Sequence, residues 1–424
     1  MTLRRQGATG DRGAFRPWWV VCGCALCLFV PGALIFGFPG VLAAHWQESF
    51  GVGRAAVGGV LFFSLGGLGV LNLASVWFPP GFTHRQRMYV GTAACALGLL
   101  ILVASDGLWG VYLWGFVSGA GAVLVYVSAL TLSQGAAPGR RGLVSGLVSM
   151  VFGVSAAMLA PVFSWMLRSL GYERMLVVLV AVTFGAGLAA MQLVRYPPPR
   201  SIPTPQERPS AAPAARTTPP IGLGIIVRQP STWALWAVLA LFGGASIAMV
   251  TLAVGLGVSK GYSAAASLVI LTAFNLTNGV SRLATGMLSD HLGRRLTMAL
   301  AFAPAGLAYL VLPHVGSLSL TALLAAVVGF GFGTMFAVSA PLVVEIFGLE
   351  GFALAFSLVM TGYGFLSGLL GPLAAGYLLD LTDGDYVVAL GYLGGLCLVS
   401  ALLVLVARPR RIRAAAGLPR PFPS

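Results

Sequence analysis

Charged side chains are scarce in this sequence. They make up 8% of the 424 residues, whereas 58% are hydrophobic. A soluble domain carries about 25% charged residues, so this chain cannot cover itself for water and its solvent must be lipid. Groups for catalysis are also few, because there are only 4 histidines and 11 acidic residues. The sequence contains no nucleotide-binding loop and no catalytic constellation, which argues against an enzyme or an ATP-driven pump.

Cysteines are few as well, and all 5 lie in apolar segments. Cys22, Cys24 and Cys27 are close together, but no histidine or carboxylate lies nearby to complete a metal site. We interpret them as small packing residues. We therefore expect neither a metal ion nor a cofactor.

Apolar runs about 20 residues long repeat along nearly the whole chain, and each is long enough to cross a bilayer as a helix. The sequence therefore predicts an all-α polytopic membrane protein with twelve transmembrane helices. The expected spans are residues 18–40, 54–78, 88–104, 108–132, 141–166, 173–194, 231–257, 264–289, 295–313, 317–340, 351–379 and 386–407.

Basic residues gather in alternate loops. The net charge of +14 could indicate a nucleic-acid partner, but the positions of the charges favour a topological role. Most arginines fall on one predicted side, whereas the other side has only Arg54, Arg168, Arg174 and Lys260. Positively charged loops stay in the cytoplasm. We therefore predict a multi-pass protein of the inner (plasma) membrane, surrounded by the lipid bilayer, with both termini cytoplasmic and no nucleic-acid partner.

A proline-rich segment, residues 195–230, divides the predicted spans into two groups of six. Such a composition predicts an extended cytoplasmic linker without a core of its own. We also expect a short surface helix in its last part, IGLGIIVRQP. The predicted domains are a six-helix bundle at 1–194, a second bundle at 231–407 and a basic cytoplasmic tail at 408–424.

The two halves resemble each other at one fixed shift. FGVSAAMLAP, which starts at residue 152, aligns without gaps with YGFLSGLLGP, which starts at residue 363, and the same shift aligns VSA at 127 with VSA at 338. A parallel repeat of six plus six helices is typical of major facilitator transporters, whose substrate site lies near the midplane between the halves. The repeat therefore predicts the major facilitator fold.

The loop after the predicted eighth span reads GMLSDHLGRR at residues 286–295. It resembles the major facilitator signature of an acidic residue at the membrane surface followed by glycine and paired basic residues. Asp290 could accept from a neighbouring helix N-terminus, whose dipole favours an anion. We expect Asp290, Arg294 and Arg295 to form a conformational latch, with a solvated loop charge as the alternative. The corresponding loop after the second span, WFPPGFTHRQR, lacks the aspartate.

Arg282 is the one charged residue that the sequence places well inside a predicted span. A charge at the centre of a bilayer costs at least about 2.5–3.5 kcal/mol, so it implies a function and a partner. No acidic residue lies deep enough in another span, and we expect an anionic substrate there. The alternative is an arginine that extends to the membrane surface. Helical side chains lean towards the helix N-terminus, which brings Arg282 towards the midplane and favours a functional role.

Asn275, Asn278 and Arg282 are spaced i, i+3 and i+7 and therefore share one helical stripe. A guanidinium presents a planar fork that matches a carboxylate. Asn278 can donate to the same carboxylate or to a neighbouring hydroxyl. Hydrogen bonding between helices explains the two asparagines equally well.

Three segments in the predicted fourth, tenth and eleventh spans read GAGAVLVYVSALTLSQ, GFGTMFAVSAPLVVEIFG and GLLGPLAAG. They look like the oxalate/formate antiporter family and its bacterial monocarboxylate transporter relatives. The resemblance implies that Tyr126 faces the substrate and that Arg282 binds the anion. Oxalate transporters have a lysine where this chain has Tyr363, which disfavours a dicarboxylate. Animal-type monocarboxylate transporters have an aspartate where this chain has Asn278, so a side-chain proton carrier is missing.

Phenylalanines are the candidates for the apolar part of the site. Phe332 and Phe336 lie one turn apart in the tenth span and would form a wall against a short alkyl chain if they face the cavity. Phe36 in the first span is a candidate of the same kind. Packing in the core is the alternative for all three.

The combined features predict a secondary transporter for small monocarboxylates of the lactate or pyruvate type, working by alternating access. We expect proton symport, with the anion bound by Arg282 and Asn278 and enclosed by Tyr126. One alternative is an organic-anion exchanger, in which the empty carrier cannot reorient because a bare Arg282 is costly. The other is a transporter-like sensor that binds without translocation.

Overall fold

The computed structural model describes residues 17–79, 81–137, 140–194 and 222–407. Within these ranges there are 12 helices long and apolar enough to cross a membrane, and no strand. The prediction of an all-α polytopic protein with twelve transmembrane helices is thereby confirmed. The basic N-terminal residues, most of the predicted linker at 195–230 and the predicted tail at 408–424 lie outside the described residues.

The N-terminal half supplies the first six spans. The first span is a pair of helices with a break at Gly37, and the other five are single helices. They are α1 (Pro17–Phe36), α2 (Phe38–Phe50), α3 (Arg54–Ala74), α4 (His84–Val103), α5 (Leu108–Ala136), α6 (Arg141–Leu170) and α7 (Tyr172–Leu193).

The C-terminal half begins with the expected short helix, α8 (Leu223–Val227). The helices of its spans are α9 (Pro230–Ser259), α10 (Ala264–Leu292), α11 (Arg294–Val311), α12 (Leu318–Thr361), α13 (Ala374–Leu381) and α14 (Tyr386–Val406). The backbone of α12 turns at Gly348, where φ is 72°, so this helix contains the tenth span and the start of the eleventh. The eleventh span then continues through two π-helical segments, Gly362–Ser367 and Leu369–Leu373, into α13.

Several spans are longer than the apolar runs that predicted them. The first runs over Trp18–Phe50 instead of 18–40, and the tenth over Leu318–Gly348 instead of 317–340. A helix continues beyond the hydrocarbon core wherever caps and neighbouring helices satisfy its terminal backbone groups. Gly51 ends the first span in the left-handed conformation, with φ of 61°, and such a C-cap is not visible in apolar run length.

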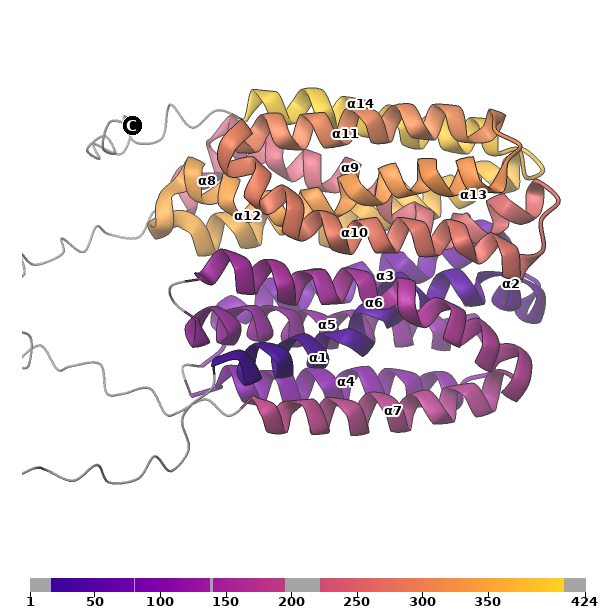
Figure 1. The fold of residues 1–424 in the computed structure, drawn as a ribbon, viewed down its shortest axis with the longest axis horizontal. Coiled ribbons are helices and arrows are strands. Elements are labelled where there is room, and N and C mark those ends of the chain that lie inside the picture. Colours follow the sequence, from indigo (N-terminus) through magenta and orange to yellow (C-terminus); the bar gives the residue numbers. More distant parts are fainter. Residues whose placement is uncertain (1–16, 80, 138–139, 195–221, 408–424) are drawn as a thin grey trace, which may run out of the picture.

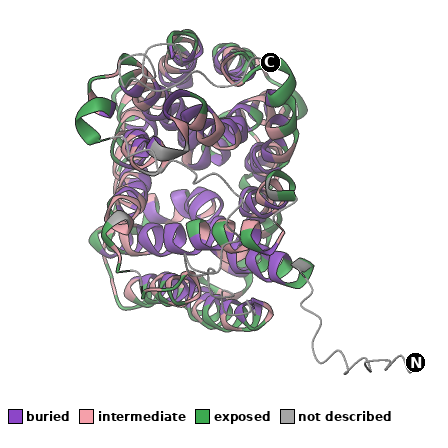
Figure 2. Ribbon diagram, turned by 90° about the vertical axis from the view of Figure 1, so that its left-hand side faces the viewer, coloured by how far each residue is buried: buried purple, intermediate pink, exposed green. Residues whose placement is uncertain are grey.

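The two halves form two layers, with α1–α7 in one and α9–α14 in the other (Figure 1). We call the end where α7 finishes and α8 begins the linker face, and the other end the opposite face. Figure 2 is a view onto the linker face, in which the buried parts of the ribbons lie mainly towards the interior and the exposed parts mainly on the outside. Large apolar side chains of the spans, such as Leu323 and Leu402, are 60% and 69% exposed, as expected for helices that face lipid.

Helix α3 packs against the eleventh span through a row of small residues that we call the seam. A Cβ atom on Gly376 would lie 2.6 Å from the Arg54 carbonyl oxygen, and one on Gly58 would meet the Pro372 carbonyl. Further along, a Cβ on Gly368 would meet the Phe62 backbone. From one contact to the next, the residue number rises by four in α3 and falls by four in the eleventh span, so the two helices run antiparallel. Such a close approach of two backbones requires small residues at the contacts.

The seam ends at the opposite face on Asp380, near the end of α13. Its two carboxylate oxygens accept hydrogen bonds from the backbone N–H groups of Arg54 and Ala55, both at 2.9 Å. These groups belong to the first turn of α3, whose dipole favours a negative charge. The Arg54 guanidinium lies 3.9 Å from the same carboxylate. A residue of the C-terminal half therefore caps a helix of the N-terminal half.

Candidate functional site

Helix α10 crosses α6 of the other half at a point where both carry glycine. A Cβ atom on Gly153 would lie 2.7 Å from Gly279 Cα and 3.3 Å from Arg282 Nε. Because neither position has a side chain, the two backbones approach closely. This contact brings the arginine on α10 against the surface of α6.

Arg282 is buried, with 2% of its surface exposed. Its side chain runs back towards the start of α10, where Nε and Nη2 donate to Asn278 Oδ1 at 3.4 and 3.2 Å. Nη1 donates to the hydroxyl of Ser149, in α6, at 3.1 Å. No ion pair formed within the described ranges includes Arg282. The guanidinium is therefore held by neutral oxygens, one from each half.

Tyr126 extends this network on the N-terminal side. Its hydroxyl lies 3.0 Å from Ser149 Oγ, so a continuous chain runs from Tyr126 through Ser149 and Arg282 to Asn278. The structure thus brings together three residues that the sequence indicated. Ser149 was not among them, because serine is common in membrane helices and nothing in the sequence relates its depth to that of a residue in the other half.

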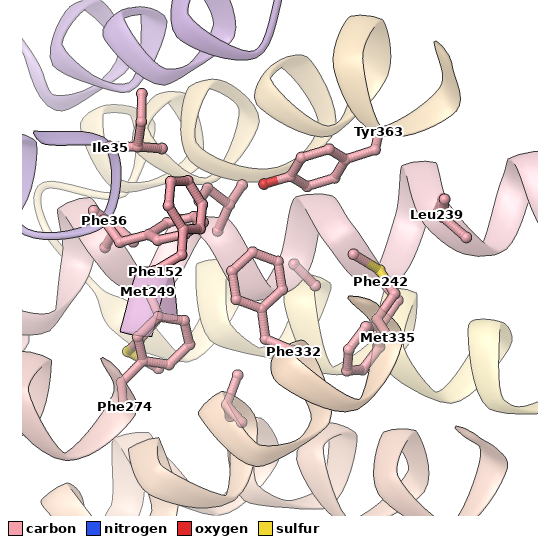
Figure 3. Close-up of a cluster of buried hydrophobic side chains, with 14 of the residues drawn as sticks. Ile35, Phe36, Phe152, Leu239, Phe242, Met249, Phe274, Phe332, Met335 and Tyr363 are labelled. Carbon is pink, nitrogen blue, oxygen red and sulfur yellow. The ribbon is translucent and has the colours of Figure 1, made fainter. Parts of the chain in front are cut away.

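Aromatic rings surround the guanidinium. Its Cζ atom lies 4.6 Å from the centroid of the Phe336 ring, 5.7 Å from that of Phe152 and 5.9 Å from that of Phe36. These distances fall within the range in which ring faces attract a cation. Phe332 closes the wall, 5.7 Å from Phe36 and 5.2 Å from Phe336 between ring centroids. The three phenylalanines named from the sequence therefore share one cluster with Phe152. Figure 3 shows Phe36, Phe152 and Phe332 of this cluster.

Asn275 Oδ1 and two other buried polar atoms near this cluster have no hydrogen-bond partner within the described structure, and the other two can donate. These two donors are the Nδ2 atom of Asn278 and the hydroxyl of Tyr363. The Tyr363 ring packs edge-on against Phe336 at 5.2 Å, and its hydroxyl points towards Phe36 and Phe152 (Figure 3). Nearly all buried polar groups in proteins are paired. Both groups can donate a hydrogen bond, so with Arg282 they form a set of donors suited to an anion.

Asn275 lies one turn further towards the opposite face, and its amide nitrogen is occupied. It donates to the Phe36 carbonyl oxygen at 3.1 Å and to that of Leu271 at 3.0 Å. The first of these bonds ties α10 to the last residue of α1, next to the break at Gly37. Asn275 thus makes the interhelical hydrogen bond that was the alternative interpretation, and it helps to hold Phe36 in the aromatic cluster.

The residues of the sequence signature lie at the linker face. Arg294 forms ion pairs with Asp290 at 3.7 Å and with Glu345 at 2.7 Å, while Arg295 donates to the Leu405 carbonyl oxygen at 3.3 Å. All of these partners belong to the C-terminal half. By contrast, Asp380 at the opposite face accepts hydrogen bonds from the N-terminus of a helix in the other half.

Comparison with known proteins agrees with this architecture. A family model described as Major Facilitator Superfamily matches residues 24–272 and 244–422. Monocarboxylate transporter 11 of Homo sapiens is 31% identical over 358 residues, which cover 80% of this chain and 70% of that protein. The mouse (Mus musculus) protein of the same name is 31% identical over 363 residues, covering 80% and 73%.

The oxalate:formate antiporter of Oxalobacter formigenes is 24% identical over 282 residues, or 64% of each chain. The resemblance that the sequence motifs indicated is confirmed by these matches. Twelve apolar helices, a two-layer arrangement and a family model that covers nearly the whole described chain lead to one assignment. The chain belongs to the Major Facilitator Superfamily.

Proposed function

We propose that this protein carries small monocarboxylates of the lactate or pyruvate type across the membrane, together with a proton, by alternating access. The observation that carries the proposal is a buried guanidinium at the contact between the halves, which, among the described residues, is held by neutral groups alone. A carboxylate is the natural counter-charge for a guanidinium fork. The proposal is also supported by the names of the relatives, which describe a monocarboxylate transporter and an oxalate:formate antiporter.

The arrangement around Arg282 favours one carboxylate and a short apolar chain. The hydroxyl of Tyr363 and the amide of Asn278 can donate to the anion, but neither carries a positive charge. Among the described residues of this cluster, a second carboxylate would therefore find no cation. The rings of Phe36, Phe332 and Phe336 offer an apolar surface to the rest of the substrate, in which a methyl group is accommodated more readily than a polar one.

The distribution of charge supports an orientation with the linker face in the cytoplasm. Arg87, Arg294 and Arg295 lie at that face, whereas Arg54 and Lys260 lie at the opposite one. Since basic loops remain cytoplasmic, both termini would lie in the cytoplasm and the opposite face would be external. We place the protein in the cell's inner (plasma) membrane on the same argument.

Uptake of labelled lactate into proteoliposomes tests the proposal. We expect accumulation driven by an inward proton gradient and its abolition in Arg282→Ala. A carrier whose uptake survived that substitution would not use the site described here. Binding without accumulation would indicate a sensor. Strict dependence on a counter-substrate inside the vesicle, without a response to pH, would indicate an anion exchanger.

A further inference from the structure

Ser149 lies at the contact between the halves and contacts both Arg282 and Tyr126. It lies in α6 and is 8% exposed. Its hydroxyl oxygen accepts from Arg282 Nη1 at 3.1 Å and lies 3.0 Å from the hydroxyl of Tyr126. This hydrogen bond joins Arg282, in the C-terminal half, to a residue of the N-terminal half.

The position of Ser149 is fixed by its surroundings. One turn away, Gly153 meets Gly279 of α10, and a Cβ atom on Gly153 would lie 2.7 Å from Gly279 Cα. On the other side, a Cβ on Gly146 would lie 3.0 Å from Leu283 Cδ1. The face of α6 that carries Ser149 is therefore held against α10 at both ends, and the hydroxyl has little freedom to move away from the guanidinium.

A buried guanidinium is costly when its donors have no acceptor. This cost distinguishes net transport from obligatory exchange. A carrier that returns empty must pass through the closed arrangement of the halves with Arg282 buried and no anion bound to it. Ser149 Oγ, Asn278 Oδ1 and the ring of Phe336 supply internal partners for that passage. An anion that binds through the guanidinium fork would replace Ser149 at Nη1.

We infer that Ser149 is a positioning residue that substitutes for the substrate carboxylate, and so allows the empty carrier to reorient. The inference rests on the proposed monocarboxylate transport and goes beyond it, since it assigns the chain to net transport instead of obligatory exchange. Ser149 acts only in the half-cycle without substrate. During exchange the carrier moves loaded in both directions, and the substrate itself satisfies Arg282.

The test compares two fluxes in proteoliposomes that contain Ser149→Ala. Net uptake of labelled lactate into empty vesicles requires return of the empty carrier, whereas counterflow into vesicles preloaded with unlabelled lactate does not. We expect net uptake to fall at least about tenfold, as for a buried donor that loses its acceptor, and counterflow to fall less than about twofold. Ser149→Thr, which keeps the hydroxyl, should retain most of the net uptake.

Ser155→Ala is the matched control. Ser155 is a buried serine of the same helix, and its hydroxyl donates to the carbonyl oxygen of Phe152 in its own helix, not across the halves. This variant should leave the ratio of net uptake to counterflow unchanged. An equal fall of both fluxes in Ser149→Ala, or a fall in neither, would overturn the inference. Absence of any lactate flux in the unaltered protein would instead refute the proposed function, and the inference with it.

Discussion

Single residues at the contact between the halves differ in how visible they are in the sequence. Arg282 can be found from the sequence because it is a charged residue within an apolar segment, and Asn278 can be found because its helical spacing places it on the same face as Arg282. Ser149 and Phe152 cannot be found in this way, since they are defined by contacts across the α6–α10 crossing. Asn275 shows the limit of spacing arguments, because it shares the stripe of Arg282 while its amide binds backbone carbonyls.

The geometry of the guanidinium, and not its charge alone, should decide the activity. We expect Arg282→Ala to lower lactate uptake at least about 100-fold, because charge-assisted hydrogen bonds contribute about 1.5–3 kcal/mol each. Arg282→Lys keeps the charge but loses the planar fork, and should lower uptake about tenfold or more. Initial rates in proteoliposomes measure both effects. Arg168→Ala, at an exposed arginine near the end of α6, is the control and should transport normally.

Tyr363 should show opposite effects on stability and on binding. Its buried hydroxyl has no partner within the described chain, so Tyr363→Phe removes an unsatisfied group and should leave thermal stability equal or higher. If the hydroxyl donates to the substrate, the apparent affinity for lactate should fall about tenfold. Melting in detergent and the concentration dependence of uptake measure the two quantities. Loss of stability with unchanged affinity would contradict the assignment.

Tyr309→Phe is the matched comparison for Tyr363→Phe. Tyr309 is also a fully buried tyrosine of the C-terminal half, but its hydroxyl donates to the carbonyl oxygen of Ala245. Removing this hydroxyl leaves a buried acceptor without its partner. We therefore expect Tyr309→Phe to destabilise the protein by about 0.5–1.5 kcal/mol and to leave the affinity for lactate unchanged.

The number of membrane-spanning helices was predictable from the sequence, but their breaks and the contacts between them were not. Apolar runs predicted 12 spans, and the structure contains them. The break at Gly37 and the π-helical turns of the eleventh span depend on how neighbouring helices pack, which no run length records. Asp380 could not be recognised as a contact between halves, since an acidic residue at a span end resembles a solvated charge until the start of α3 is placed beside it.

The capping of α3 by Asp380 should stabilise the closed arrangement at the opposite face. Asp380→Asn removes the charge from this cap, and Gly53→Ala places a Cβ atom 2.5 Å from Asp380 Oδ2, which forces the carboxylate away. Both variants should raise the population in which the opposite face is open. Spin labels at Ser49 and Val387, both exposed at that face, should report longer distances. Combining the two substitutions should add little to either one.

Asp383→Asn is the control for the Asp380 substitutions. Asp383 lies in the adjoining turn with φ of 50°, a conformation that asparagine adopts readily, and it is exposed. The Asp383→Asn substitution removes one negative charge from the same face and leaves the cap of α3 intact. Distances in this variant should match those of the unaltered protein. A shift equal to that of Asp380→Asn would mean that net charge, and not the cap, controls the opening.

At the scale of the whole molecule, the asymmetry of charge predicts the orientation in the membrane. In a variant with Cys22 replaced by serine, a cysteine at Val387 should react with an impermeant maleimide added outside intact cells, because the opposite face is expected to be external. A cysteine at Leu292, exposed at the linker face, should react only after permeabilisation. The reverse pattern would place the linker face outside and contradict the proposed topology.

Charge also constrains the cycle as a whole. The described acidic residues all lie near the ends of the membrane spans or in loops, so no acidic side chain of the described chain accompanies Arg282 through the membrane. In the proposed cycle, one monocarboxylate and one proton cross together without net charge. Lactate uptake should therefore respond to an imposed pH gradient but not to a potassium diffusion potential set with valinomycin at constant pH. A rate that changed with the potential would mean that the anion moves without its proton, because moving one elementary charge across 100 mV is worth about 2.3 kcal/mol.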